Sequence, residues 1–400
     1  MRCELDEMLP LRSVMVTLED LTKSYYKARA NKRRSRDSVV FEIDYESELV
    51  RLMEDINSRS FVADGNYAFV VFSPKPREIF ATRMRNRIVH HYLDWKMRPI
   101  YEMVLSDRSF NNREGMGLHK AIDTFRNDIK EMTEGYMKDA WLVHLDLKGY
   151  FPNADVEIAL RQQLDLIERY YEGSDKDDMK YMMESCMRAD PARHCNIYVP
   201  LDRWDAIPDS KSLFQKPTGT GGAIGFLCWQ NAMGLYINDV VKWLASHDFM
   251  RVMVFVDDIY MVTKDKDITL AMMPELRRRL AELKVSLNER KFYCQHYSKG
   301  IMCLGTMLKF DRAYVNNTTS KRAFKSLSDW KGKFLHCLDR QRLLCSLNTY
   351  CGIFKKRNNR KELLSFIGSG LKMFRKKLVL NGKKNCFNLK KGRKTWSNSP

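Results

Sequence analysis

The chain has no apolar run long enough to cross a membrane, because none approaches the ~18 consecutive apolar residues that a spanning helix needs. It begins Met-Arg-Cys-Glu-Leu-Asp-Glu, with acids where a signal peptide would be apolar. Its ten cysteines form no Cys-x-x-Cys pair. Cys186, His194 and Cys195 lack a fourth ligand at a spacing suited to zinc. These absences predict a cytoplasmic protein with reduced thiols, without a membrane span or a disulfide frame.

Acidic residues are scarce in the last fifth of the chain. Residues 321–400 hold 22 Lys and Arg against three acids, so this segment accounts for the whole net charge of +19. The other 320 residues balance, with 47 basic and 47 acidic side chains. Aromatic residues are interleaved with the basic ones: Phe324, Trp330, Phe334, Tyr350, Phe354 and Phe374. The pattern favours a folded nucleic-acid-binding region over a solubilising tail, and a membrane-surface anchor is the weaker alternative.

The remaining sequence predicts a mixed helical and stranded protein, and 400 residues with 44% hydrophobic content allow two or three subdomains. Apolar spacing predicts helices over 17–60 with a charged break at 31–37, and over 79–104, 120–136, 155–189, 224–245 and 268–284. A strand is expected at 67–72 and a hairpin at 250–263.

Two adjacent carboxylates, Asp257 and Asp258, interrupt the apolar run 251–262. An Asp-Asp pair is most often a solvated turn. Here no Gly or Pro follows, and β-branched and aromatic residues continue the run. Like charges in such a place are costly to desolvate unless a cation offsets them. The pattern indicates a hairpin whose bend carries a divalent-metal site.

A third acid, Asp146, interrupts a second strand-like run, Trp141-Leu-Val-His-Leu-Asp. Two strands that deliver three carboxylates to one point would form a two-metal phosphoryl-transfer site. We therefore expect Asp146, Asp257 and Asp258 to hold two Mg²⁺ ions, with Mn²⁺ as an alternative.

Six motifs stand in a fixed order along the chain. They are Arg113-x-Gly115-x-Gly117-x-His119 after basic residues that include Arg77 and Arg87; Asp146-x-Lys148-x-x-Phe151; Gly222-Ala-Ile-Gly225-Phe-Leu-Cys-Trp229-Gln230; Phe255-Val-Asp257-Asp258; Leu287-Asn-Glu-Arg-Lys291; and Gly300-Ile-Met-Cys-Leu304-Gly305. In order and spacing these resemble the motifs of reverse transcriptases, over roughly residues 60–310.

The resemblance implies an α+β right-hand polymerase with fingers, palm and helical thumb. It divides the chain into an N-terminal extension and fingers (1–140), a palm (141–310) with a fingers insertion at about 156–215, a thumb (311–380) and a basic tail (381–400). It implies RNA-directed DNA polymerase activity with an RNA template, a DNA or RNA primer and deoxynucleotides as partners.

The resemblance also implies roles for individual residues. Asp146, Asp257, Asp258 and the Leu147 backbone carbonyl would bind metal, and Lys291 would protonate pyrophosphate. Lys75, Arg77, Arg87, Phe151, Gly225 and Gln230 would contact the nucleotide, with Phe151 excluding a 2′-hydroxyl. Arg113, Gly117, Leu304 and Gly305 would contact nucleic acid.

Two departures separate the chain from common members of the family: Phe255 replaces a Tyr, and Trp229-Gln230 stands where many have Ser-Pro. Ile224, Gly225 and Gln230 are most similar to the diversity-generating retroelement branch, as is the block Trp204-x-x-x-Pro208-x-x-Lys211-Ser-Leu-Phe. That branch implies error-prone copying, a structured non-coding RNA and a basic accessory protein. Retron-like or antiphage-defence enzymes are the alternative, followed by a catalytically silent RNA-binding scaffold and, disfavoured by Phe151, an RNA-dependent RNA polymerase.

Overall fold

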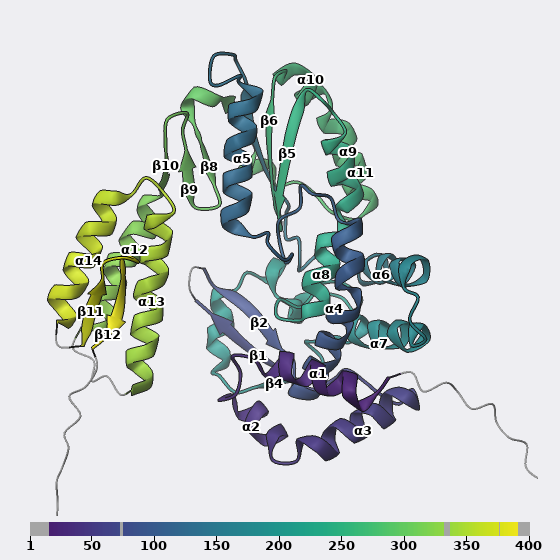
Figure 1. Cartoon of the computed structure of the whole chain (residues 1–400). Helices are drawn as coiled ribbons and strands as arrows, with labels where there is room; N and C mark the ends of the chain where they lie inside the picture. The colour runs from purple at the N-terminus through teal and green to yellow at the C-terminus, as the bar shows by residue number, and fades with distance from the viewer. Residues whose placement is uncertain (1–15, 73–74, 332–336, 376, 391–400) are drawn as a thin grey trace, which may run out of the picture. The chain divides into compact units, whose positions relative to one another are not determined.

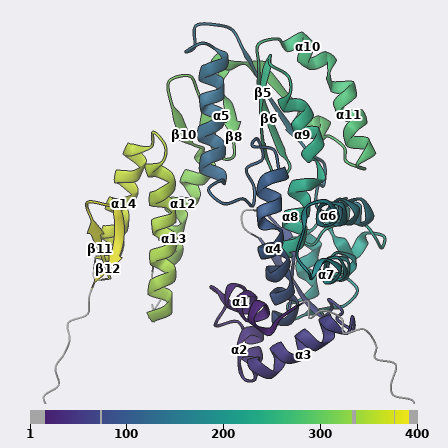
Figure 2. The same ribbon diagram turned by 45° about the vertical axis from the view of Figure 1, so that its right-hand side comes forward.

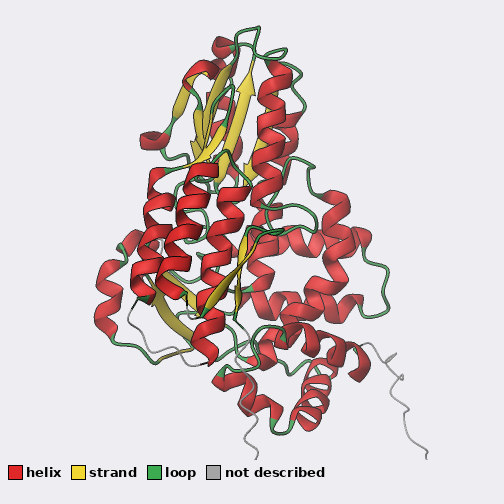
Figure 3. Cartoon of the chain, turned by 60° about the vertical axis from the view of Figure 1, so that its left-hand side comes forward, coloured by secondary structure: helices red, strands yellow, loops and turns green. Residues whose placement is uncertain are grey.

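A computed structural model describes residues 16–72, 75–331, 337–375 and 377–390. The chain divides into two compact units that interleave along the sequence. Unit 1 contains the described residues within 16–117, 144–259 and 267–292, and unit 2 contains those within 118–143, 260–266 and 293–390. The four consecutive domains expected from the sequence therefore stay a prediction. The α+β class is confirmed, since helices and several small sheets alternate (Figure 3).

Unit 1 begins with three short helices: α1 (Leu18–Arg29), α2 (Arg36–Glu42) and α3 (Tyr45–Asn57). The hydroxyl of Thr17 caps α1 by accepting from the Asp20 N–H at 3.2 Å, and Ser35 caps α2 in the same way. The charged break predicted at 31–37 is thus the turn between α1 and α2. Helix α1 packs against the longer α4 (Met84–Val104) (Figure 1).

A three-stranded sheet follows, with the order β2 (Arg77–Ala81), β1 (Asn66–Val71), β4 (Cys195–Ile197). Strands β1 and β2 are antiparallel, with Val70 opposite Glu78 and Ala68 opposite Phe80. The helix predicted from residue 79 was wrong at its start: residues 77–81 alternate in burial with the period of a strand, and α4 begins only at Met84.

Helices α6 (Val156–Tyr170) and α7 (Lys176–Arg188) pack against each other (Figures 1 and 2). Three short 3-10 turns follow at Leu201–Ala206, Asp209–Lys211 and Leu213–Gln215. The helix predicted over 224–245 is divided into α8 (Leu227–Tyr236) and α9 (Asn238–Ala245). The buried Asn238 side chain explains the break, because it accepts from the Ser106 N–H at 2.8 Å and donates to the Val104 carbonyl at 3.1 Å.

The central sheet has the strand order β5 (Met250–Phe255), β6 (Asp258–Thr263), β3 (Trp141–Asp146), β7 (Tyr293–His296). The predicted hairpin at 250–263 is confirmed as β5 and β6. The division into units runs through this sheet, since β3 and β6 contribute residues to both. The expected helix at 268–284 is two helices, α10 (Lys266–Ala271) and α11 (Met273–Glu282).

Unit 2 contains helix α5 (Leu118–Met132) and a three-stranded sheet with the order β10 (Ala313–Val315), β9 (Thr306–Leu308), β8 (Ile301–Cys303). It also contains the helices α12 (Asn317–Trp330), α13 (Cys337–Lys355) and α14 (Arg360–Phe374). A terminal hairpin, β11 (Leu378–Asn381) and β12 (Cys386–Leu389), packs on α13 and α14 (Figure 2).

The basic last fifth is folded over its described residues. Phe354, Phe374 and Phe387 are buried in one core, and Phe324, Trp330 and Tyr350 pack against it. Phe334 lies outside the described residues. The interleaved aromatics are therefore packing residues. The predicted tail 381–400 begins inside the terminal hairpin, because Phe387 belongs to the core, and residues 391–400 lie outside the description.

Candidate active site

Three carboxylates of unit 1 meet at one end of the central sheet. Asp146 is the last residue of β3, Asp258 is the first of β6, and Asp257 lies in the two-residue turn between β5 and β6. The Leu147 N–H donates to the Asp257 carbonyl at 2.9 Å, which joins the backbone after β3 to that turn. The strand pattern thus brings together acids that are 111 residues apart in the sequence.

The turn that carries Asp257 is strained. Val256 has a φ of 60°, a left-handed conformation that a β-branched residue rarely adopts. Such a residue costs on the order of 1–3 kcal/mol and persists only where the surroundings hold it. The Asn111 side chain is part of that support, since its oxygen accepts from the Val256 N–H at 3.3 Å.

Asp146 is almost buried, and both of its carboxylate oxygens have partners. Oδ1 pairs with the Lys291 ammonium at 2.5 Å, and Oδ2 accepts from the Asn288 amide at 2.9 Å. The Asn288 N–H also donates to the Asp146 carbonyl at 2.8 Å. The Leu287–Lys291 motif is therefore folded directly onto the first predicted metal ligand.

Asp258 contacts a residue that sequence reasoning missed. The Nε2 atom of His144 lies 2.7 Å from Oδ1 of Asp258. His144 precedes Asp146 by two residues on β3, so both side chains point to the same face of the strand. This two-residue spacing was the signal in the sequence that could have identified His144.

Asp257 experiences the charge of the other acids most directly. Burial raises the pKa of the Asp257 carboxyl, Asp258 and Asp146 raise it further, and Arg77 opposes them. A carboxylate destabilised by burial and by two like charges is stabilised by a bound cation.

The donor set therefore suits a hard divalent cation, because all three groups are carboxylates. As the side chains stand, no three His, Cys, Asp or Glu residues in the described part of the chain are grouped as metal ligands. Asp146 and Asp258 would have to exchange Lys291, Asn288 and His144 for the metal. The assignment of metal to these residues and to the Leu147 carbonyl stays a prediction.

The predicted triphosphate ligands differ in where they lie. Lys75 is exposed just before β2, and Arg77 is the exposed first residue of that strand, with its charge acting on Asp257. Arg87 is half-buried in the first turn of α4 and donates to the Thr82 carbonyl at 3.3 Å. Burial lowers the pKa of Arg87. The charge of Arg77 acts on Asp257, whereas the charge of Arg87 acts on Asp37. The nucleotide contacts expected of Lys75, Arg77 and Arg87 stay predictions.

Phe151 lies in the loop after β3 and is half-buried. Its carbonyl accepts from the Gly222 N–H at 2.8 Å. The neighbouring Tyr150 belongs to the core, because it is 4% exposed and its hydroxyl donates to the Met233 carbonyl at 2.6 Å. The Phe151 ring is thus not required to fill the interior.

Gly225 and Trp229 have packing roles that the sequence did not reveal. Gly225 has a φ of +126°, and a Cβ there would lie 2.3 Å from the Phe80 carbonyl oxygen, so glycine permits close approach to strand β2. Trp229 is 1% exposed, and its ring lies where a Cβ on Gly222 would meet it at 2.5 Å. Gln230 is half-buried on α8.

Arg113 stabilises the loop after α4 through hydrogen bonds of its side chain. Its guanidinium donates to the Glu102 carboxylate at 2.9 Å and to the carbonyls of Ser106 at 2.7 Å and Ser109 at 3.2 Å. Gly117 has a φ of +116°, which requires glycine for conformational reasons. The nucleic-acid contacts expected of both residues stay predictions.

Leu304 and Gly305, in unit 2, form the two-residue turn between β8 and β9. Their φ angles are 46° and 80°, and the Leu304 N–H donates to the Tyr260 hydroxyl at 3.2 Å. Two successive left-handed residues are typical of a tight hairpin turn. The turn conformation explains why residue 305 is a glycine. The contact of Leu304 and Gly305 with the primer stays a prediction.

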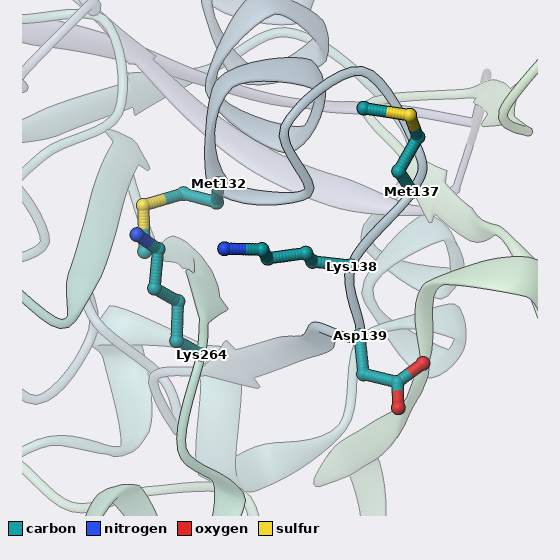
Figure 4. A pocket seen from close by; sticks show the side chains of 5 residues that line it. All are labelled: Met132, Met137, Lys138, Asp139 and Lys264. Atoms are coloured by element: carbon teal, nitrogen blue, oxygen red, sulfur yellow. The ribbon is translucent and has the colours of Figure 1, made fainter.

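A separate hollow of about 400 Å³ belongs wholly to unit 2. It is lined by Met132, Met137, Lys138, Asp139 and Lys264. Lys138 points into it toward Met132 and Lys264, whereas the Asp139 carboxylate points away (Figure 4). None of the predicted site residues is part of its lining.

Among the described residues, no helix combines the length and the apolar character needed to span a bilayer. Eight of the described cysteines are free thiols: Cys186, Cys195, Cys228, Cys294, Cys303, Cys345, Cys351 and Cys386.

No protein-family profile matches the chain, and no curated protein matches it. Similar solved structures include apo telomerase from Candida tropicalis, with a TM-score of 0.49 and 11% identity over 78% of this chain and 58% of that one. A form of it truncated from the C-terminal domain gives 0.44 and 11%, over 64% and 55%. Telomerase from Candida albicans in complex with a TWJ fragment of telomeric RNA gives 0.44 and 10%, over 84% and 67%.

This chain spans little more than half the length of the first two structures. With TM-scores below 0.5, these likenesses carry no argument about what the chain does. The functional interpretation depends on the residues and their geometry.

Proposed function

We propose that this chain is a reverse transcriptase, an RNA-directed DNA polymerase that joins deoxynucleotides by two-metal nucleotidyl transfer. The observation that carries the proposal is the meeting of Asp146, Asp257 and Asp258 at one end of a sheet, with the pKa of Asp257 raised by burial and by the other two acids. Three acids in such a place cost stability, and cation binding is the chemistry that offsets this cost.

In this proposal the primer 3′-hydroxyl gives its proton to solvent, and its oxygen attacks the α-phosphorus of the nucleotide. The bond between the α-phosphorus and the bridging oxygen breaks, and pyrophosphate leaves on that oxygen. Mg²⁺ held by Asp146, Asp257 and Asp258 would supply a lower pKa at the 3′-hydroxyl and would neutralise charge on the leaving group. Arg77 binds the triphosphate, since it is exposed and its charge already acts at Asp257. Lys291, whose side chain is 52% exposed, leaves Asp146 and donates a proton to pyrophosphate.

Phe151 lies beneath the incoming sugar in this proposal. Its half-buried ring packs edge-on against the buried Tyr150, with the ring centroids 6.1 Å apart, and keeps part of its surface exposed. A ribose 2′-hydroxyl would collide with the ring, so deoxynucleotides are preferred.

The test is extension of a primer on a defined RNA template by the wild type and by Asp146→Asn and Asp257→Asn. Loss of the ligands removes the main electrostatic stabilisation of phosphoryl transfer, so we expect extension to fall by more than about 1000-fold. Asp165→Asn, at an exposed carboxylate paired with Arg169 on α6, is the matched control and keeps full activity. Extension at the wild-type rate by Asp257→Asn would exclude the proposal.

A catalytically silent RNA-binding scaffold is the second candidate. The engagement of both Asp146 oxygens by Lys291 and Asn288 favours it, because a scaffold keeps that ion pair permanently. The two candidates separate on Mn²⁺ binding, measured by electron paramagnetic resonance. A polymerase binds Mn²⁺ in the wild type and loses it in Asp257→Asn, and a scaffold binds RNA equally in both without binding the metal.

For the biological role we propose error-prone copying in a diversity-generating retroelement, with a structured non-coding RNA and a basic accessory protein as partners. Ile224, Gly225 and Gln230 support this branch by resemblance. The departure at Trp229 concerns packing against Gly222. Copying one RNA with all four deoxynucleotides and counting errors by template base tests the role. Errors concentrated opposite adenine support it, and even errors or untemplated repeats favour a retron-like or defence enzyme.

A further inference from the structure

Glu78, on strand β2, is a buried carboxylate held entirely within unit 1. It is 6% exposed. Its Oε2 accepts from the Trp204 indole N–H at 2.8 Å and from the Ser212 hydroxyl at 2.7 Å, and Oε1 accepts from the Leu213 N–H at 2.8 Å. All three donors are neutral and belong to the Trp204–Phe214 block that the sequence singled out.

Aromatic packing reinforces these bonds. The Phe214 ring lies 5.8 Å from Trp204 and 5.6 Å from Phe80, between the ring centroids. Phe80 is two residues after Glu78 and points to the same face of β2. The block 204–214 is therefore fixed to one face of a single short strand.

Strand β2 needs such support because it lies at one edge of its sheet, where β1 is its one strand partner among the described residues. Its other edge contacts the segment before α8: the Phe80 N–H donates to the Ile224 carbonyl at 3.3 Å, and Gly225 approaches the Phe80 carbonyl. An edge strand without these contacts would be held by β1 alone.

Arg77 immediately precedes Glu78. Consecutive strand residues point to opposite faces, so the contacts that fix Glu78 also set the backbone position of Arg77 while leaving its side chain exposed. Arg77 is the triphosphate ligand of the proposed function, and it is the exposed first residue of β2.

From these contacts we infer that the block 204–214, attached through Glu78, positions Arg77 for the triphosphate of the incoming nucleotide. Glu78, Trp204 and Ser212 are positioning residues in this inference, which rests on the proposed polymerase function. They touch neither nucleotide nor metal. The insertion is thereby part of the nucleotide site, although it contributes no ligand.

The test is steady-state primer extension by Trp204→Phe, which removes the indole N–H and keeps an aromatic ring. We expect the KM for deoxynucleotides to rise about 2- to 10-fold, the range for one lost hydrogen bond. The kcat and the Kd for primer–template stay unchanged. A purely structural role would instead lower the active fraction, and so the apparent kcat, without changing KM.

Two matched controls and a second variant accompany it. Trp243→Phe makes the same change on α9, at a half-buried Trp that stacks on Arg279. Ser212→Ala removes one donor to Glu78, and Ser210→Ala removes an exposed hydroxyl two residues away. We expect Ser212→Ala to raise the same KM and both controls to leave it unchanged. If Trp204→Phe fails to fold, Ser212→Ala carries the test.

A double-mutant cycle identifies the residue through which the block acts. In an Arg77→Ala background, Trp204→Phe should raise KM no further, because the group that it positions is gone. Additive effects, or an unchanged KM in both Trp204→Phe and Ser212→Ala, would overturn the inference while wild-type extension upholds the polymerase. A wild type that extends no primer overturns the proposed function, and the inference with it.

Discussion

Two sets of carboxylates in unit 1, Glu78 on strand β2 and the three acids at the end of the central sheet, are held in opposite ways. Glu78 accepts three hydrogen bonds from neutral donors of one block. Asp146 and Asp258 are paired instead with Lys291, which is half-exposed, and with His144. Asp257 has the other two acids as neighbours, which with burial raise its pKa.

The kind of partner distinguishes a carboxylate that supports the fold, Glu78, from the carboxylates of the proposed catalytic site. Neutral donors of one packed block satisfy the Glu78 carboxylate without a charged partner, and leaving one of them unpaired costs about 1–3 kcal/mol. A flexible lysine can leave, so Asp146 stays available to another cation. We therefore expect substitutions at the sheet end to change activity more than stability, and substitutions around Glu78 to change both.

The largest expected effect is at Asp257. Asp257→Asn should abolish extension and at the same time stabilise the protein in EDTA, because it removes a buried charge beside two like charges. Since the folded-state pKa of Asp257 is raised, its stability penalty is absent at low pH and grows as the pH rises from the ordinary carboxyl pKa through the raised one. Thermal unfolding should therefore show the Asp257→Asn variant gaining over wild type from acidic to neutral pH, and an equal melting temperature throughout would contradict this.

Lys291 provides the next test. Lys291→Met should lower kcat about 100-fold, within the range for loss of a general acid. Lys284→Met is its matched control, because Lys284 also pairs with an aspartate, Asp155, at 2.5 Å in unit 1. The control should keep its activity, with a stability loss below about 1 kcal/mol as for exposed pairs. Equal losses of kcat in Lys291→Met and Lys284→Met would show that the lysine paired with Asp146 has no special role in the reaction.

Tyr150 and Phe151, in the loop after β3, allow the same comparison between a residue that supports the fold and a residue of the proposed site. Phe151→Val should increase ribonucleotide relative to deoxynucleotide incorporation about 10-fold, an effect of roughly 1.4 kcal/mol, with little change in melting temperature. Tyr150→Phe, which loses the hydrogen bond to Met233, should lower stability by about 1 kcal/mol and leave sugar preference unchanged. Single-turnover incorporation of matched ribo- and deoxynucleotides measures the first effect. An unmoved ratio in Phe151→Val would mean that the ring only packs.

The smallest expected effect concerns the terminal hairpin. Deleting residues 381–400 would remove Phe387 from the core, so charge substitution is the sharper experiment. Lys383 and Lys384 are exposed in the β11–β12 turn, and changing both to Gln should reduce the slope of log affinity for RNA against log salt by up to about 2. Lys242→Gln on α9 is the control. An unchanged slope would show that these charges serve solubility alone.

Local patterns predicted the elements whose contacts are close in sequence. The hairpin at 250–263 followed from an apolar run, and the helical segments around 155–189 from their spacing. Strand β2 was missed because its pairing with β1 and its burial against residues 204–214 are tertiary. The division of the helix at Ile237 was missed because Asn238 bonds to residues more than 130 positions away.

For the candidate site too, local patterns in the sequence predicted single residues but not the contacts between distant segments. Aspartates within strand-like runs indicated where acids would lie, because charge in such a run is unusual. The pairings themselves are tertiary. His144 is marked in the sequence by its spacing from Asp146, but its partner Asp258 is 114 residues away, and Trp204 is 126 residues from its partner Glu78. Arg113 and Gly225 show the converse. Each matched a motif, and each also has a packing reason that the motif did not reveal.

The contact between Gly222 and Trp229 limits the order in which this chain can change. A methyl group at 222 would lie 2.5 Å from the indole, which is held in the core with 1% exposure. Alanine at 222 is therefore unfavourable while Trp229 is present, whereas a small residue at 229 leaves room for it. A lineage that acquires alanine at 222 must therefore replace Trp229 first. Descendants that retain the tryptophan should retain the glycine.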